Sequence, residues 1–185
     1  MKKLILLASI LVIGILCLFF VSTHKNNTTL VAYFSATGNT RGVAERLASV
    51  TGADLFEITP EVLYTTEDLN WRNDKSRAST EMNDKKSRPM IVNKVTDMEK
   101  YSTVFIGFPI WWGREPSIID TFIEAYNFSG KTIIPFATSG STPTTEEAAI
   151  NIRALAPNAN VSNGKRFPVD VSKDELKVWA SEWVK

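Results

Sequence analysis

Residues 30–52 read LVAYFSATGNTRGVAERLASVTG. The run Leu30–Phe34 is apolar and rich in residues that favour strands, so it predicts a short buried strand. Apolar residues then recur at the helical spacing i, i+4 and i+7, at Val43, Leu47 and Val50, and Gly52 ends this pattern. Ala53–Ile58 predicts a second strand. A strand, a loop, a helix and a second strand in this order indicate the start of a parallel α/β sheet.

The rest of the chain continues this alternation. Further strands are predicted at Thr103–Ile110, Thr132–Ala137 and Val161–Val171. One helix is predicted after Pro116, with the inner face Ile118, Ile119, Phe122 and Ile123. Two more follow capping-box pairs: Thr144 with Glu147, ending at Pro157, and Ser172 with Glu175, carrying the apolar face Leu176, Trp179 and Trp183. Five strands alternating with helices predict one doubly wound α/β domain over residues 29–185.

A polar, irregular stretch separates the two halves of this pattern. It runs from Thr59 to Tyr101, leaves room for a helix over Trp71–Asp84, and is expected to be extended near Pro89. Such a stretch is most often a solvated face, although Trp71 and the mixed charges around it are also compatible with a partner surface.

Composition limits the chemistry that the chain can perform alone. The 185 residues, 44% of them hydrophobic, suffice for one packed domain. Lys and Arg number 21 against 20 Asp and Glu, which argues against nucleic acid as a partner because backbone binding needs a basic excess. The single cysteine, Cys17, and single histidine, His24, argue against disulfides, cysteine nucleophiles, metal sites built on either residue and Ser-His-Asp hydrolases. Any chemistry must come from a bound cofactor or from other residues.

Residues 1–28 are expected to be a targeting segment and tether, outside the folded domain. Lys2 and Lys3 precede the uncharged run Leu4–Val21, which as a transmembrane helix would be about 27 Å long, close to the thickness of the bilayer core. A poor cleavage site after this run favours an uncleaved membrane anchor over a cleaved signal that would give a secreted form. The excess of positive charge before the run predicts that the body lies outside the cytoplasm.

Three loops follow predicted strands, at the edge where doubly wound sheets bind ligands: Ser35–Thr40, Pro109–Gly113 and Thr138–Thr145. The first offers three hydroxyls, an amide and a glycine directly before a helix. Together with the N–H groups and dipole of that helix, these groups predict an anion site without a lysine. The loop matches neither the P-loop nor the dinucleotide fingerprint. An ordinary helix cap would explain one or two of these residues, but not the whole run.

The other two loops are less specific by themselves. Trp111 and Trp112 after a buried strand are most often core or interface residues. Beside an anion site, however, they could stack on a flat aromatic ring. The third loop could supply hydroxyls and backbone donors to the edge of such a ring, although alone it is typical of a surface loop.

The three loops together resemble the flavodoxins. SATGNT at 35–40 is similar to the flavodoxin phosphate loop, and FPIWWGREP at 108–116 and GKTIIPFATSG at 130–140 resemble a short-chain branch of that family. The resemblance extends from about Thr29 to the C-terminus. It implies a flavodoxin-like fold with strand order 2-1-3-4-5 and non-covalently bound FMN.

The resemblance also assigns residues to FMN. Those implied to hold the phosphate are Ser35, Thr37, Gly38, Asn39 and Thr40. Those implied to flank the isoalloxazine ring are Pro109, Ile110, Trp111, Trp112 and Gly113, with one tryptophan stacking on it. Ser139 and Gly140 are implied to line its other side.

The expected function is electron transfer through FMN, exchanging electrons with a redox partner protein or a small molecule. Two alternatives stay open. The first is an NAD(P)H-dependent quinone or flavin reductase on the same fold, and the second is a membrane-tethered module that binds flavin without redox cycling. The near-neutral body does not support a strongly acidic docking face for a basic partner.

Overall fold

A computed structural model describes residues 28–140 and 144–184. The strands in this part of the chain are β1 (Thr29–Tyr33), β2 (Asp54–Glu57), β3 (Thr103–Pro109), β4 (Thr132–Thr138), β5 (Asn160–Val161) and β6 (Lys165–Phe167). They form one parallel sheet in the order β2-β1-β3-β4-β5, and β6 also pairs with β4. The strand order 2-1-3-4-5 is therefore confirmed, with a sixth strand added.

The prediction of a single fifth strand over Val161–Val171 is wrong. β5 pairs with the first two residues of β4, and β6 pairs with its last three. Gly164 separates the two short strands with φ +70°, and its Cα lies so close to β4 that a Cβ would be 2.2 Å from the Pro135 carbonyl oxygen. The chain turns here because only glycine combines a positive φ with this close approach.

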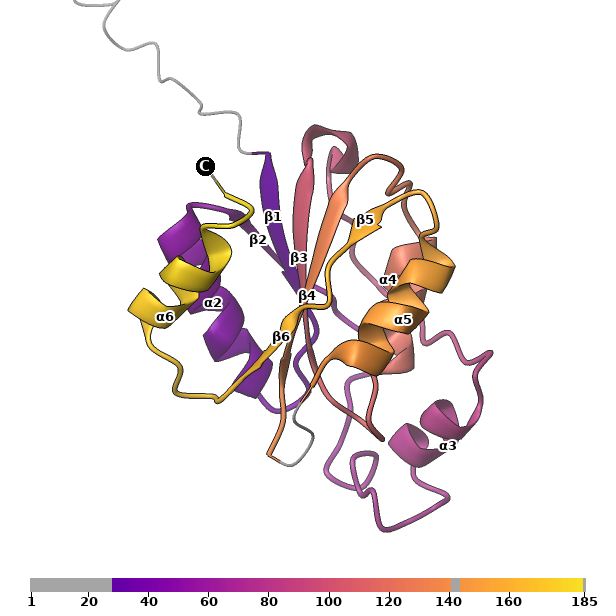
Figure 1. Cartoon of the computed structure of the whole chain (residues 1–185). Coiled ribbons are helices and arrows are strands. Elements are labelled where there is room, and N and C mark those ends of the chain that lie inside the picture. Colours follow the sequence, from indigo (N-terminus) through magenta and orange to yellow (C-terminus); the bar gives the residue numbers. More distant parts are fainter. Residues whose placement is uncertain (1–27, 141–143, 185) are drawn as a thin grey trace, which may run out of the picture.

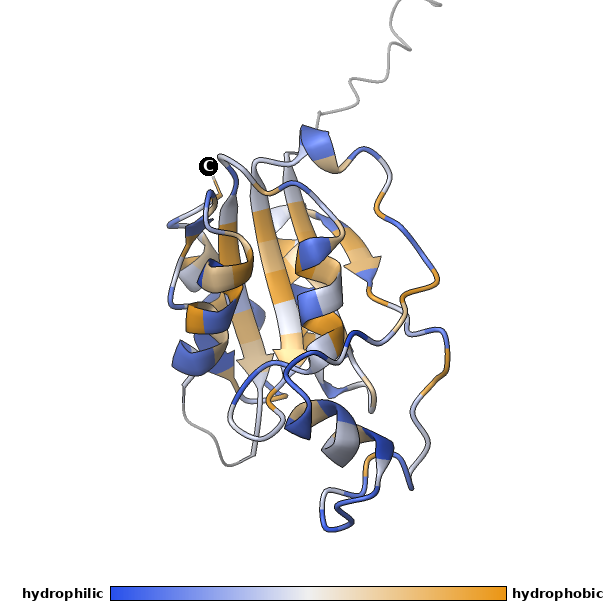
Figure 2. Cartoon of the chain, turned by 90° about the vertical axis from the view of Figure 1, so that its right-hand side faces the viewer, coloured by the Kyte–Doolittle hydropathy of each residue, from blue (hydrophilic) through white to orange (hydrophobic). Residues whose placement is uncertain are grey.

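The helices of the described residues are α2 (Asn39–Thr51), α3 (Arg77–Asn83), α4 (Ser117–Glu124), α5 (Glu146–Leu155) and α6 (Lys173–Ala180), with a 3₁₀ turn at Met98–Lys100. α2 and α6 cover one face of the sheet and α4 and α5 cover the other (Figure 1). Alternate residues of β1 divide between the two cores: Leu30 and Ala32 pack beneath α4 and α5, whereas Val31 and Tyr33 pack beneath α2 and α6. Figure 2 shows the apolar strands enclosed between more polar helices.

The predicted helix ends are partly confirmed. Gly52 ends α2 with φ +68°, and the Ser172 side chain caps α6 by accepting a hydrogen bond from the Glu175 N–H. The Thr144–Glu147 capping box is wrong. Thr145 occupies the cap of α5 without a side-chain capping bond, because its hydroxyl donates to the Asn163 carbonyl oxygen at 2.6 Å.

The helix allowed over Trp71–Asp84 is shorter than expected, since α3 begins at Arg77. The residues before it form turns in which Asn70 and Asn73 side chains accept hydrogen bonds from backbone N–H groups two residues later. Such local bonds compete with helix formation. α3 then begins where the Ser76 hydroxyl accepts from the Ser79 N–H.

The predicted membrane anchor, residues 1–28, lies outside the described residues except for Thr28. Between residues 28 and 140 and between 144 and 184, no helix is both long and apolar enough to cross a membrane.

Candidate functional site

The three predicted loops follow β1, β3 and β4 and so lie at one edge of the sheet, at the lower end of the molecule in Figure 1. The first and third loops are joined directly. The hydroxyls of Thr40 and Thr138 are hydrogen bonded at 2.9 Å although the two residues are 98 positions apart in the chain. The fold therefore brings the first and third loops together at one edge of the sheet.

The Ser35–Thr40 loop ends in a helix start that is open to an anion. Gly38 adopts φ +87°, and the first helical hydrogen bond runs from the Gly42 N–H to its carbonyl oxygen at 3.1 Å. The N–H groups before Gly42 thus lack helical acceptors. Within the described residues, the side chains of Ser35, Thr37 and Asn39 form no hydrogen bond. This loop therefore combines a helix N-terminus with uncommitted neutral donors, the arrangement that binds phosphate.

Two neighbouring side chains have structural roles here. Thr40 is 1% exposed and its hydroxyl is engaged with Thr138, which leaves its backbone as the part able to contact a ligand. Arg41 forms an ion pair with Glu57 of β2. The cation beside the loop is thus already paired. This agrees with an anion site that needs no cationic side chain.

A tight turn carries the two tryptophans. Trp111 and Arg114 exchange both backbone hydrogen bonds, at 2.9 and 3.0 Å, around Trp112 and Gly113. Both central residues have positive φ, +47° and +85°, as a type I′ turn requires. Left-handed backbone at a residue other than glycine costs about 1–3 kcal/mol and concentrates at functional sites. The turn leaves Trp112 48% exposed.

The two tryptophans are not equivalent. Trp111 is half-buried and packs edge-to-face on Phe34 and Tyr64, with ring centroids 5.6 and 5.3 Å away. Tyr64 is itself fixed by a hydrogen bond to Glu81 and by Arg77 over its ring at 4.0 Å. Burial raises the pKa of Tyr64, so it stays a neutral donor. Trp111 therefore forms a rigid wall, whereas Trp112 offers its ring to solvent or to a ligand.

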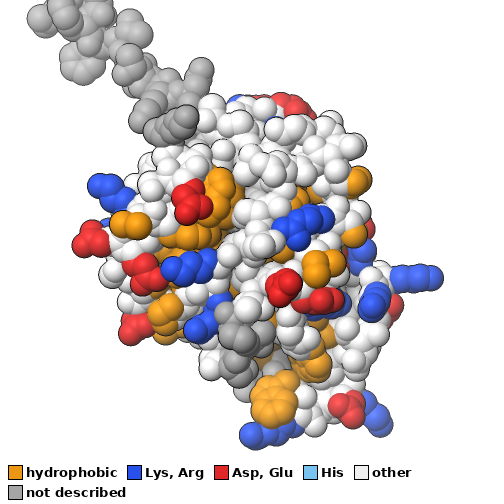
Figure 3. All heavy atoms as spheres, in the orientation of Figure 1, with side chains coloured by type: hydrophobic (Ala, Val, Ile, Leu, Met, Phe, Trp, Pro, Cys, Tyr) orange, Lys and Arg blue, Asp and Glu red, His pale blue; other side chains and the backbone are white. Residues whose placement is uncertain are grey.

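A pocket of about 480 Å³ lies between the first loop and the tryptophan turn. It is lined by Ala36, Thr37, Leu69, Trp71, Ala78, Pro109, Ile110, Trp111 and Trp112. Thr37 from the first loop and Pro109–Trp112 from the second are thus brought together as predicted. Figure 3 shows hydrophobic side chains on the surface at this end of the molecule, where Trp71 is 65% exposed.

The sequence did not assign Leu69, Trp71 and Ala78 to this site. They come from the polar Thr59–Tyr101 stretch, which folds over the carboxyl end of the sheet. A solvent-exposed tryptophan in a polar segment was the one available signal, and it did not indicate which surface the ring would face.

The third loop contributes less to the pocket that the structure describes. Ser139 and Gly140 directly follow β4 but are not among its lining residues. The Ser139 carbonyl oxygen accepts a hydrogen bond from Arg166 at 2.9 Å, which ties the loop to β6. Residues 141–143 lie outside the described part of the chain. The assignment of Ser139 and Gly140 to a ligand thus stays a prediction.

Comparison with known proteins agrees with this architecture. Among solved structures, a candidate flavoprotein of Bacteroides uniformis is 43% identical, with a TM-score of 0.79, over 84% of this chain and 98% of the other. A candidate flavoprotein of Bacteroides eggerthii is 42% identical, with a TM-score of 0.79, over 84% of this chain and 96% of the other. A Lactobacillus acidophilus flavoprotein in complex with FMN shares the fold at 23% identity and a TM-score of 0.62, over 83% of this chain and 99% of the other.

No curated protein matches the sequence. The family model described as flavodoxin, however, matches residues 28–183, nearly all of the chain outside the predicted anchor. This match covers all three loops and both halves of the sheet. The chain therefore belongs to the flavodoxin family.

Proposed function

We propose that this chain is an electron-transfer protein that binds FMN non-covalently at the carboxyl edge of its sheet. One observation carries the proposal: a single pocket is lined both by Ala36 and Thr37, from the loop that leads into the start of α2, and by a wall of tryptophans. FMN has the matching pair of parts, a phosphate and a flat heteroaromatic ring. The FMN complex of the Lactobacillus acidophilus flavoprotein, which has the same fold, supports this choice of ligand.

The phosphate half of the site fits without a cation. Ser35, Thr37, Gly38 and Asn39 would hold the phosphate through hydroxyl, amide and backbone donors, aided by the dipole of α2. Thr40 would contribute its backbone N–H, since its hydroxyl is bound to Thr138. Because these donors are neutral, the negative charge of the phosphate would be stabilised by the N–H groups and the dipole of α2 and not by a cationic side chain.

The ring half fits by size and by chemistry. A volume of about 480 Å³ lies in the range of small-molecule sites, and most of the lining is apolar or aromatic. We assign the stacking role to Trp112, because its ring is exposed while that of Trp111 is held by Phe34 and Tyr64. Trp71 would cover the ring from the Thr59–Tyr101 stretch, with Arg72 4.8 Å from the centroid of the Trp71 ring.

Bound FMN would supply one- or two-electron chemistry, and the side chains would bind it, orient it and exclude water. By resemblance to the flavodoxins, the Trp112–Gly113 peptide would be the one that changes orientation towards the flavin, and Gly113, with φ +85°, has the conformational freedom for this change. We further propose that a redox partner protein or a small molecule exchanges electrons with it, and that residues 1–28 hold the domain at a membrane, outside the cytoplasm.

An anaerobic reductive titration of the full chain with FMN tests the function. A stoichiometric flavin band that is reduced one electron at a time, and only slowly by NAD(P)H, would support the carrier. Fast reduction by NAD(P)H would favour the quinone or flavin reductase instead. Bound flavin that cannot be cycled would favour the non-redox module, and absence of binding after reconstitution would contradict all three.

A further inference from the structure

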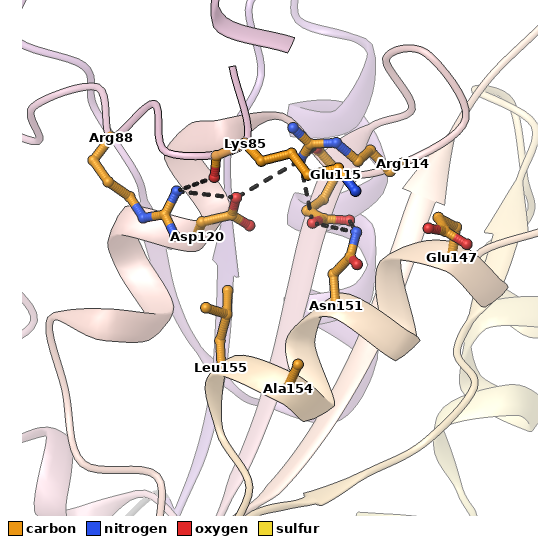
Figure 4. Close-up of a pocket in the computed structure, with 9 residues that line it drawn as sticks. All are labelled: Lys85, Arg88, Arg114, Glu115, Asp120, Glu147, Asn151, Ala154 and Leu155. Carbon is orange, nitrogen blue, oxygen red and sulfur yellow. Dashed lines mark hydrogen bonds and ion pairs between the residues drawn. The ribbon is translucent and has the colours of Figure 1, made fainter. Parts of the chain in front are cut away.

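A second, smaller pocket lies directly behind the tryptophan turn, between α4 and α5. Its volume is about 180 Å³, and it is lined by Lys85, Arg88, Arg114, Glu115, Asp120, Glu147, Asn151, Ala154 and Leu155. Figure 4 shows Glu115 and Asp120 facing into it, with Arg88 and Arg114 above them and Asn151 below. The proposed flavin site uses none of these side chains.

The two carboxyl groups are buried but differ in their hydrogen bonding. Glu115 is 0% exposed and accepts hydrogen bonds from the Asn151 side chain at 3.1 and 3.4 Å and from Arg114 at 3.4 Å. Asp120 is 5% exposed, and its Oδ2 lies 3.6 Å from both Arg88 and Arg114, beyond ordinary hydrogen-bonding distance. Among the described residues, its buried Oδ1 has no hydrogen-bond partner.

A proton on Glu115 would remove the charge repulsion between the two buried carboxyl groups. The two carboxyls share one partner, because Glu115 Oε1 lies 3.4 Å and Asp120 Oδ2 lies 3.6 Å from Nη1 of Arg114. A proton on Glu115 would leave the pair with a single negative charge beside this arginine. Two adjacent buried carboxylates, by contrast, would repel each other without water to screen them. Burial first, and the charge of Asp120 second, raise the pKa of Glu115 to about 8. Burial also raises the pKa of Asp120.

Arg114 links this pair to the tryptophan turn. Its backbone closes the turn by two hydrogen bonds to Trp111, while its side chain reaches Glu115, Asp120 and the Ser117 hydroxyl at 3.4–3.6 Å. The Arg114 side chain is 14% exposed, so it is held inside the cluster. The strained positive φ of Trp112 thus lies two residues from an anchor whose partners are ionisable.

We propose that Glu115 and Asp120 hold one proton between them and that this proton, acting through Arg114, positions the Trp111–Arg114 turn for flavin binding. Glu115 and Asp120 are positioning residues, since neither lines the larger pocket. The part of the inference that concerns flavin rests on the proposed function, whereas the shared proton does not.

Other charged groups surround the pair and set its balance. From the segment after α3 these are Lys85 and Arg88; from the turn, Arg114; from α4, Glu124, which binds Arg88 at 2.8 Å; and from α5, Glu147. With one shared proton, the single charge of the pair faces the two arginines. Loss of that proton places a second negative charge in the pocket and draws Arg114 towards both carboxylates, which distorts the turn.

The first test uses the full chain without flavin. In a chain labelled with ¹³C at the Asp and Glu carboxyls, NMR should show Glu115 titrating near its raised pKa of about 8, identified by its loss in Glu115→Gln. The Gly113 amide should shift with the same midpoint, and it should lose this response in Glu115→Gln. Asp120→Asn should move the Glu115 titration to lower pH, which is a second readout if Glu115→Gln folds poorly. Titration of Glu115 in the ordinary carboxyl range, or a Gly113 amide that ignores it, would overturn the proposal.

The second test measures FMN affinity against pH. Between about pH 6 and about pH 9 we expect the affinity to fall about threefold or more, since a pKa that differs by about half a pH unit between free and bound protein gives that change. Glu115→Gln should remove this extra fall and leave only the titration of FMN itself, whereas Glu147→Gln, an exposed carboxylate of the same pocket, should follow the unmodified chain. Identical pH profiles in all three proteins would overturn the role of the pair in flavin binding. Absence of FMN binding at every pH would overturn the proposed function, and the first test would still decide whether the proton is shared.

Discussion

The two loops that meet the proposed flavin are built in opposite ways. The Ser35–Thr40 loop presents backbone N–H groups and short neutral side chains, and its neighbouring cation is bound to Glu57. The Trp111–Arg114 turn presents a large ring from a strained backbone, and its anchor lies among buried ionisable groups. A backbone site has nothing to titrate near neutral pH, whereas a turn anchored on buried carboxyls does. The protein's part in phosphate binding should therefore stay constant with pH, apart from the titration of the FMN phosphate itself, whereas binding of the ring should vary.

The largest effect should come from removing the phosphate. Riboflavin should bind to the full chain at least about a hundredfold more weakly than FMN, because hydrogen bonds to a charged group contribute about 1.5–3 kcal/mol each. Fluorescence titrations with both flavins measure the ratio. Thr37→Val should narrow it by weakening FMN and leaving riboflavin unchanged. Equal affinities for the two flavins would show that the first loop does not hold the phosphate.

Removal of an exposed tryptophan should affect both flavins equally. Trp112→Ala and Trp71→Ala should each weaken FMN and riboflavin about tenfold or more, since stacking on an aromatic side chain contributes about 1–3 kcal/mol. Leu63→Ala is the matched control, because Leu63 is 70% exposed on the same segment as Trp71 but does not line the pocket. If Trp112→Ala behaves like Leu63→Ala, the stacking assignment is wrong.

The free energy of unfolding should depend on pH through the buried carboxyl of Glu115, next to the Trp111–Arg114 turn. The pKa of Glu115 rises from 4.5 to about 8 on folding, so between these values the folded chain binds a proton that the unfolded chain has released. Stability therefore falls as pH rises through this window, by about 1.4 kcal/mol for each pH unit that separates the folded and unfolded pKa values. Urea unfolding should show this fall in the unmodified chain and in Glu147→Gln. Glu115→Gln should flatten it, and a fall of unchanged size in Glu115→Gln would argue against a protonated Glu115.

Two glycines separate backbone strain from flavin binding. Gly113 and Gly130 both have positive φ, and a Cβ added at either would lie in open space, but Gly130 precedes β4 at the opposite edge of the sheet. Alanine at either position should cost about 1–2 kcal/mol of stability, the cost of left-handed backbone. Only Gly113→Ala should also weaken FMN, by about threefold to tenfold. Equal FMN affinities in the two variants would show that the Trp111–Arg114 turn is not part of the flavin site.

The smallest effect should come from the cation beside the first loop. Arg41→Gln should change FMN affinity by less than about threefold, because Arg41 is an exposed side chain already paired with Glu57 and such pairs contribute little. The same titrations at low salt measure it. A loss of tenfold or more would mean that Arg41 leaves Glu57 for the phosphate.

Local pattern predicted the parts of this molecule that local pattern determines. Hydrophobic spacing and turn residues were enough to predict the strand at Leu30–Phe34 and the helix that ends at Gly52. They also predicted the strands before Trp111 and Ser139. The first loop could be interpreted because its chemistry lies within six consecutive positions, at 35–40.

Features set by contacts distant in sequence could not be predicted. The split between β5 and β6 depends on how closely Gly164 approaches β4. Trp71 reaches the site because its segment is tied back elsewhere, through the Pro60–Ile91 bridge and the bond from the Ser117 hydroxyl to the Glu81 carbonyl oxygen. Glu115 lies between Arg114 and Pro116 and resembles an exposed loop residue in the sequence, but in the structure it is buried and accepts a hydrogen bond from Asn151 of α5.

FMN is proposed to occupy the pocket between the first loop and the tryptophan turn. A two-dimensional ¹H–¹⁵N NMR titration of the full chain with FMN tests it most directly. We predict that the largest shifts fall on the backbone amides of residues 35–40 and on the indole N–H groups of Trp71 and Trp112. Saturable binding whose shifts fall on other residues, or no shifts at all, would contradict it.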